Sequence, residues 1–171
     1  MILSFPLLCK LAGSSVIFAS VGGAVLAGKK RETERLLRLD SLIALIGFAR
    51  EQVDRYLTPV SEILRRCDPE LLAGCLRGCA GISEKWVPRD MPELVRALDG
   101  GSYAGDGRQA MAEFAAVFGR SFREEELHCC DRCAGELIRL RKELAVSLPE
   151  KRRSRTVIGV CAAAAAVIIL L

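Results

Sequence analysis

The chain has 171 residues, enough for one domain with a modest core, and a net charge of +4. Hydrophobic residues make up 51% and charged residues 27%, and they are segregated, with apolar residues at the two ends and charges in the middle. The mild charge, clustered beside the apolar ends, argues against nucleic-acid binding. The eight cysteines lie mostly in helix-like stretches, which argues against a disulfide framework and for a reducing compartment.

The first apolar stretch covers residues 11–28 and carries no charge (LAGSSVIFASVGGAVLAG). As a helix it would be about 27 Å long, close to the hydrocarbon thickness of a bilayer. We therefore predict an N-terminal transmembrane segment within residues 1–28. A cleaved signal peptide fits less well, because the positive residues follow the apolar run instead of preceding it. The glycines of residues 23–29 also resemble a phosphate-binding loop, but position 30 is Lys and no strand precedes it.

Small residues recur every fourth position in this segment, at Ser15, Ala19, Gly23 and Ala27. Such stripes allow membrane helices to approach one another closely. We predict that this stripe packs against another helix, either the second apolar segment or another protein. Incidental composition is the alternative, because alanine and glycine are common in membrane helices.

The middle of the chain is predicted to be an all-α bundle of five or six helices over residues 29–155. A long amphipathic helix is expected over 29–57, then helices begun by Thr58-Pro59 and by Asp68-Pro69, the latter reaching about Cys79. Residues 78–90 are expected to connect to a helix over 91–98 capped by Asp90, and residues 99–107 to form a loop. A short helix over 109–118 and a long last helix after Ser121, with Pro149 ending or bending it, complete the bundle.

The second apolar segment, residues 156–171, would be about 24 Å long as a helix, which is short for a membrane span. A buried or interfacial helix is the alternative, but the basic flank favours a C-terminal transmembrane segment. The basic residues of both flanks lie on the sides that face the middle domain, at Lys29, Lys30, Arg31, Lys151, Arg152, Arg153 and Arg155. The positive-inside rule therefore places the middle domain in the cytoplasm and both termini across the membrane.

The cysteines of the middle domain raise the question of a metal site. His128, Cys129, Cys130 and Cys133 follow one another closely, and Cys75 and Cys79 are one helical turn apart, so together they offer ligands for tetrahedral zinc. However, Cys130 and Cys133 fall on or beside the apolar stripe, where free cysteine packs as a small hydrophobe. We predict no metal and no cofactor, and keep a metal-binding or thiol redox-sensing membrane protein as the alternative function.

No catalytic motif withstands inspection, so we predict that the chain is not an enzyme. Its carboxylates alternate with Arg and Lys at helical spacing, which is typical of solvated helix faces. A membrane-anchored enzyme remains an alternative, and it would require a deep polar pocket with convergent titratable groups. The predicted partner-binding residues lie in the segment RSFREEE, at Arg120, Arg123, Glu124 and Glu125. Helix capping alone would also explain acidic residues at this position.

The ordered combination of segments resembles the stage III sporulation protein AB family of endospore-forming bacteria. The resemblance rests on the N-terminal apolar helix with its basic exit, the turn LTPVSEIL, the segment VFGRSFREEELHCCDRCAGEL and the ending RRSRTVIGV with its apolar tail. The family typically has an acidic residue where this chain has Gln52, and the cysteine clusters are not a family feature.

The resemblance implies a non-enzymatic platform or adaptor subunit of the channel complex between mother cell and forespore, required for endospore formation. It implies location in the mother-cell membrane facing the forespore, and a soluble domain similar to the cytoplasmic domains of type II secretion F proteins. The implied partners are a secretion-type ATPase (stage III sporulation protein AA), other membrane proteins of the same operon, and membrane lipid.

Overall fold

The computed structural model describes the backbone of residues 5–56, 58–79, 81–82, 86–99, 105 and 107–170. Side chains are described for most of 20–149 and, beyond that, at 154, 157–159, 161 and 165. The described chain contains helices and no strand, which confirms the all-α prediction. It divides into two compact units: unit 1 comprises Met1–Thr33 and Val146–Leu171, and unit 2 is Glu34–Ala145.

Helix α1 runs from Phe5 to Tyr56 without interruption and contributes to both units. It ends where the sequence predicts, because Pro59 cannot continue the helical hydrogen bonds. Thr58 secures this end: its backbone N–H donates to the carbonyl of Gln52 (3.2 Å) and its hydroxyl donates to the Gln52 side-chain oxygen (3.0 Å). Where the family resemblance implies an acidic residue, the amide oxygen of Gln52 thus supplies the acceptor that a carboxylate would.

Two short helices follow, α2 (Val60–Arg66) and α3 (Pro69–Cys75). Asp68 caps α3 as predicted, its carboxylate accepting from the Glu70 backbone N–H at 2.9 Å, with Pro69 in the first turn. The predicted extension of this helix to Cys79 is wrong. Gly78 adopts φ 81°, a left-handed conformation that a helix cannot contain, and the Cys79 N–H bonds to the Leu76 carbonyl in a turn.

Helix α4 (Met91–Asp99) is held at its start by a reciprocal cap. The Asp90 carboxylate accepts from the Glu93 N–H (2.7 Å), and the Glu93 carboxylate accepts from the Arg89 N–H (2.6 Å). Helix α5 (Arg108–Val117) begins after Gly107, which has φ 73°. Both helices lie within about one residue of their predicted positions.

Helix α6 extends from Arg123 to Leu170 as one element, with Pro149 inside it. The sequence predicts that Pro149 ends or bends this helix. Pro149 does not end it, because the helix continues through this residue. Proline removes one backbone donor and crowds the preceding turn, but the surrounding helix provides the remaining hydrogen bonds.

The predicted membrane spans are only partly covered by the described residues. Among the residues with described side chains, no helix is both long enough and apolar enough to cross a bilayer. Most side chains of residues 11–28 and 156–171 lie outside this description, including those of Ser15 and Ala19. Of the predicted packing stripe, Gly23 and Ala27 are described and exposed, and a Cβ added at Gly23 would meet nothing within 4 Å.

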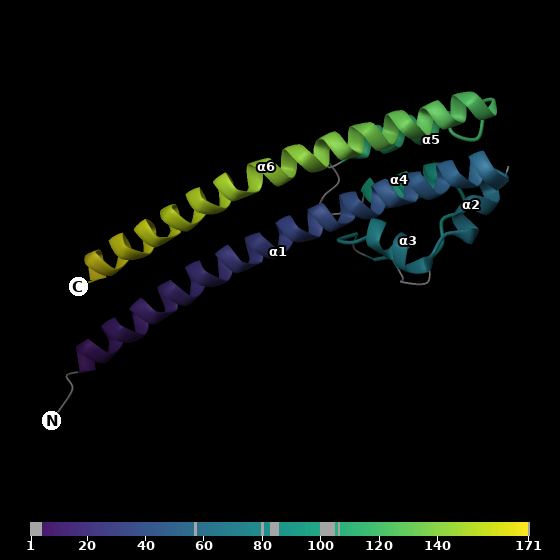
Figure 1. The fold of residues 1–171 in the computed structure, drawn as a ribbon. Helices are drawn as coiled ribbons and strands as arrows, with labels where there is room; N and C mark the ends of the chain where they lie inside the picture. Colours follow the sequence, from purple (N-terminus) through teal and green to yellow (C-terminus); the bar gives the residue numbers. More distant parts are fainter. Residues whose placement is uncertain are drawn as a thin grey trace. The chain divides into compact units, whose positions relative to one another are not determined.

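Unit 2 is organised around an antiparallel pair of helices, the part of α1 from residue 34 onward and the first part of α6 (Figure 1). Three ion pairs join them: Asp40 with Arg141, Arg50 with Asp131 (2.8 Å), and Asp54 with Arg123 (2.6 Å). Helices α2 to α5 pack against this pair around one apolar core. Its fully buried members include Leu39, Leu42, Leu45, Ile46, Ile63, Leu94, Met111, Phe114, Cys130 and Leu137.

Candidate partner-binding surface and thiol pocket

The predicted partner-binding residues lie where the chain turns from α5 into α6. Gly119 adopts φ 87°, and its backbone N–H donates to the carboxylate of Glu126 at 3.0 Å. The Arg120 N–H bonds to the Val117 carbonyl at 3.1 Å. These bonds hold the turn in a defined conformation, so the side chains of residues 120–125 project from a supported backbone.

Arg123 differs from the other predicted residues because it serves the fold. Its Nη2 donates to the carbonyl oxygen of Asp54 (2.8 Å) and to the Asp54 carboxylate (2.6 Å). Asp54 lies in the last turn of α1, where backbone carbonyls lack helical partners. Arg123 therefore caps α1 and fixes the start of α6 beside its end.

Arg120, Glu124 and Glu125 remain available to a partner. Their side chains are exposed and form no ion pair or side-chain hydrogen bond within the described chain. Between them stands Phe122, whose side chain is 84% exposed, and Tyr56 at the end of α1 is 61% exposed. We call the set Tyr56, Arg120, Phe122, Glu124 and Glu125 the bundle-end surface. Exposed aromatic residues ringed by charges are typical of protein contact sites.

The sequence interpretation missed the two aromatic residues of this surface. Tyr56 lies at the end of a predicted helix, and Phe122 lies within the segment RSFREEE, of which only charged residues are predicted to bind a partner. The available signal was an aromatic residue directly between charged ones in a turn, at Arg120-Ser121-Phe122-Arg123.

The position of the bundle-end surface within unit 2 follows from the antiparallel helices. Asp40 and Arg141 pair near one end of the unit, close in sequence to Glu34 and Ala145, where the chain enters and leaves it. Asp54 and Arg123 pair at the opposite end. The chain therefore enters and leaves unit 2 at one end, and the bundle-end surface occupies the other.

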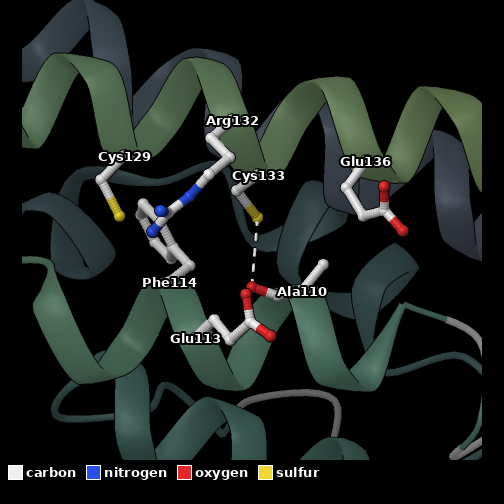
Figure 2. A pocket seen from close by; sticks show the side chains of 7 residues that line it. All are labelled: Ala110, Glu113, Phe114, Cys129, Arg132, Cys133 and Glu136. Atoms are coloured by element: carbon white, nitrogen blue, oxygen red, sulfur yellow. Dashed lines mark hydrogen bonds between the residues drawn. The ribbon is translucent and has the colours of Figure 1, made fainter.

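Cys129 and Cys133 of α6 face α5 across a cavity of about 220 Å³ (Figure 2). Figure 2 shows Cys129 and Cys133 pointing from α6 toward α5, and the Cys133 thiol donates to the Ala110 carbonyl at 3.6 Å. Glu113, Arg132 and Glu136 line the same cavity. His128, which the sequence offered as a fourth ligand, is exposed and does not line it.

The surroundings of Cys129, Cys130 and Cys133 keep their thiols protonated. Burial, with smaller contributions from the neighbouring thiols, raises the pKa of Cys130 and of Cys133 to about 12. Burial also raises the pKa of Cys129, and the Arg132 guanidinium opposes that change. Thiols must lose their proton to bind a metal or to act as nucleophiles. This environment favours packing over metal or redox chemistry.

Cys75 and Cys79 lie elsewhere in unit 2, beside α3. Burial raises the pKa of both thiols, to about 12 for Cys75, while the charge of Arg38 acts in the opposite direction. Within the described residues, the cysteines, His128 and the carboxylates form no group of three or more that could hold a metal ion. The two cysteine clusters of the sequence therefore do not meet in one site.

The fold defines an all-α protein whose unit 2 is a compact bundle with an aromatic and charged end. The sequence model of the stage III sporulation protein AB family matches residues 10–171. The chain belongs to this family, which confirms the resemblance. No curated protein and no solved structure matches the chain.

Proposed function

We propose that the chain is a non-enzymatic platform subunit of the membrane complex that joins mother cell and forespore during stage III of sporulation. The observation that carries this proposal is the family match over residues 10–171, which includes both apolar segments and the whole of unit 2. The description of the family names a stage of sporulation. The protonated thiols and the exposed contact surface fit an interaction role better than a catalytic one.

In this proposal the two apolar segments, 11–28 and 156–171, anchor the chain in the mother-cell membrane, and unit 2 faces the cytoplasm. The geometry of unit 2 suits such anchoring, because the chain enters and leaves it at the same end. The basic residues at 29–31 and 151–155 would then meet the cytoplasmic headgroups. The bundle-end surface lies at the other end of unit 2, and cytoplasmic partners are proposed to contact it there.

The proposed partners are a secretion-type ATPase (stage III sporulation protein AA) and the other membrane proteins of the same operon. A subunit that stands between an ATPase and a membrane channel needs a well-packed body and an accessible contact surface. The buried apolar core of unit 2 supplies the packed body, and the bundle-end surface supplies the contact surface.

The experiment is crosslinking in sporulating cells, followed by purification of the full chain through an N-terminal tag and identification of attached proteins. We expect to recover the ATPase and other channel components. The same tag on an unrelated two-span membrane protein serves as the control. Recovery of no channel component above this control would refute the proposal.

A further inference from the structure

A groove of about 530 Å³ lies on the surface of unit 2, apart from the thiol pocket. Its lining comes from helix α4 and from the segment that precedes this helix. We call it the Trp86 groove, and the described residues that line it are Gly81, Ile82, Trp86, Glu93, Arg96 and Ala97. Pockets that hold ligands commonly measure ~300–1,000 Å³. The groove is therefore large enough for a bulky side chain together with the backbone beside it.

The Trp86 groove lies toward the end of unit 2 that is opposite the bundle-end surface. Leu98, which follows the groove residue Ala97, accepts a bond from Arg38 of α1 at its carbonyl, at 3.2 Å. Arg38 lies one helical turn after the start of unit 2, and about 24 Å along α1 from Asp54 at the bundle end. A partner in the groove and a partner on the bundle-end surface therefore contact different parts of unit 2.

The apolar part of the groove lining is accessible to a partner. Ile82, Trp86 and Ala97 pack against the buried core, but each is only partly buried. At Gly81 an added Cβ would meet nothing within 4 Å, so the lining leaves open space there. A partly accessible tryptophan in a hollow is a typical contact point for an apolar side chain of a partner.

The charged groups beside the groove differ in how far the fold already uses them. The carboxylates of Asp90 and Glu93 are both engaged in the reciprocal cap of α4, where they accept from the Glu93 and Arg89 N–H groups. The side chains of Arg89 and Arg96 are exposed and form no ion pair with the described residues. Arg96 only donates from Nε to the Pro92 carbonyl, at 3.4 Å. The cationic groups therefore remain available, and they favour a negatively charged partner.

A polypeptide fits this lining better than the headgroup of an anionic lipid does. One oxygen of the Glu93 carboxylate accepts from the Arg89 N–H at 2.6 Å, and the other accepts no bond within the described residues. A peptide offers backbone N–H donors to this second oxygen, and its acidic side chains can accept from Arg96. A phosphate group offers mainly acceptors and negative charge, which the Glu93 carboxylate would repel.

We infer that the Trp86 groove is a second contact site of the chain and binds an acidic polypeptide segment of a partner protein. An apolar side chain of this segment lies against Trp86, and a carboxylate beside it pairs with Arg96. The inference goes beyond the proposed function, because it adds a site on another part of unit 2 and names the chemistry of its ligand. It holds for any partner protein that presents such a segment.

The test uses the full chain, one copy in each bilayer nanodisc of zwitterionic lipid, and the fluorescence of Trp86, the single tryptophan. The probe is an end-blocked peptide, Asp-Glu-Phe-Glu-Asp. We expect it to shift the Trp86 emission to shorter wavelength in a saturable manner and to reduce quenching by acrylamide. Control peptides have lysines in place of the acidic residues or alanine in place of phenylalanine, and each should bind about tenfold more weakly. Equal binding of the three peptides would overturn the inference.

Charge reversal supplies a second arm that misfolding cannot imitate. Arg96→Glu is expected to raise the Kd of the acidic peptide about tenfold and to lower the Kd of the lysine peptide by a similar factor. A misfolded variant would lose both peptides, so a gain of the lysine peptide requires an intact groove. Arg65→Glu is the matched control, an exposed arginine of α2 without an ion pair among the described residues, and it should change neither Kd. An Arg96→Glu chain with the native preference would refute the site.

Two further arms examine the other occupants of such a groove. Discs that contain anionic lipid test a headgroup, and discs that hold two copies of the chain test a second copy. In both cases we expect no shift of the Trp86 emission without the peptide. A shift caused by anionic lipid alone, or by a second copy alone, would assign the groove to that occupant and contradict the inference. No other channel component takes part, so these results are independent of the proposed function.

Discussion

Arg38 is the residue at which this fold departs most from the expectation that charges lie on the surface. Its side chain is 2% exposed, and Nη2 donates to the Leu98 carbonyl at 3.2 Å, in the last turn of α4 where carbonyls carry partial negative charge. Nε and Nη1 have no hydrogen-bond partner in the part of the chain that is described. A buried cation with unsatisfied donors opposes folding.

We therefore expect Arg38→Met to leave the free energy of unfolding unchanged or to raise it by about 1–4 kcal/mol, because methionine removes the charge and keeps much of the volume. The measurement is urea unfolding of the full chain in detergent, followed by fluorescence of Trp86, the single tryptophan, which lies in unit 2. Arg38→Ala is the comparison, and its cavity should lower stability. A large decrease of the unfolding free energy in Arg38→Met would show that the guanidinium stabilises the fold.

The buried thiols predict a dependence of stability on pH. Cys130 and Cys133 have a pKa of about 12 in the fold against 9.0 for an exposed thiol, so the folded state retains protons that the unfolded state loses. The stability that these two protonated thiols contribute is fully present below pH 9, and it decreases as the pH rises from 9 toward 12. The steepest slope is about 1.4 kcal/mol per pH unit for each thiol.

The check compares the native chain with the Cys130→Ala, Cys133→Ala double variant between pH 8 and pH 11. The double variant should show a shallower decrease of unfolding free energy, whatever its absolute stability. Equal slopes would mean that these thiols ionise as easily in the fold as in the unfolded chain.

At the scale of elements, the start of α5 depends on one glycine. Gly107 has φ 73°, and a Cβ added there would lie 2.6 Å from Cδ2 of Leu137, a core residue of α6. Gly81 has the similar φ of 80° but nothing within 4 Å of an added Cβ. The two positions separate backbone strain from steric overlap.

Gly81→Ala is expected to lower the free energy of unfolding by about 1 kcal/mol, the usual strain of alanine at positive φ. Gly107→Ala should lower the free energy of unfolding by about 1–3 kcal/mol more than Gly81→Ala does, because Leu137 must move within a packed core. The same urea titration measures both variants. Similar losses at the two positions would show that the α5–α6 contact yields easily.

The ion pairs between α1 and α6 differ in whether the arginine also bonds a backbone carbonyl. Arg50 and Asp131 form a surface pair, whereas Arg123 also bonds the Asp54 backbone carbonyl. Arg123→Ala is expected to lower unfolding free energy by about 1–2 kcal/mol, and to remain destabilising when Asp54 is also alanine. Arg50→Ala should have no measurable effect in an Asp131→Ala background. A double-mutant cycle for each pair provides the measurement, and full loss of the Arg123 effect in Asp54→Ala would exclude the capping role.

For the whole molecule, the proposal of two membrane anchors has a direct chemical test. Cys161 lies in the second apolar segment, and its side chain is exposed in the isolated chain. If residues 156–171 enter the bilayer, Cys161 should resist a membrane-impermeant maleimide in intact vesicles and react after SDS denaturation. Ser154→Cys, in the basic flank, should react in intact inverted vesicles. Equal labelling of positions 154 and 161 would contradict insertion.

The local elements of unit 2 could be predicted because their signals are local. Asp68-Pro69 and Asp90 begin helices by bonding to backbone donors two or three residues away, so sequence alone carries that information. The end of α3 is predicted about four residues too late, although the sequence carries a signal for the earlier end: Gly78, with φ 81°, lies in the turn that follows the helix.

The sequence by itself determined the all-α class, the family and the order of helices, since periodicity, caps and segment order are properties of neighbouring residues. Only the tertiary structure decided which charges are buried, which thiols share a pocket, and that Tyr56 and Phe122 lie at one end of unit 2. These depend on residues far apart in the chain, such as Asp54 and Arg123, brought together by antiparallel packing. No local pattern records such pairings, because their energy exists only after the helices have packed.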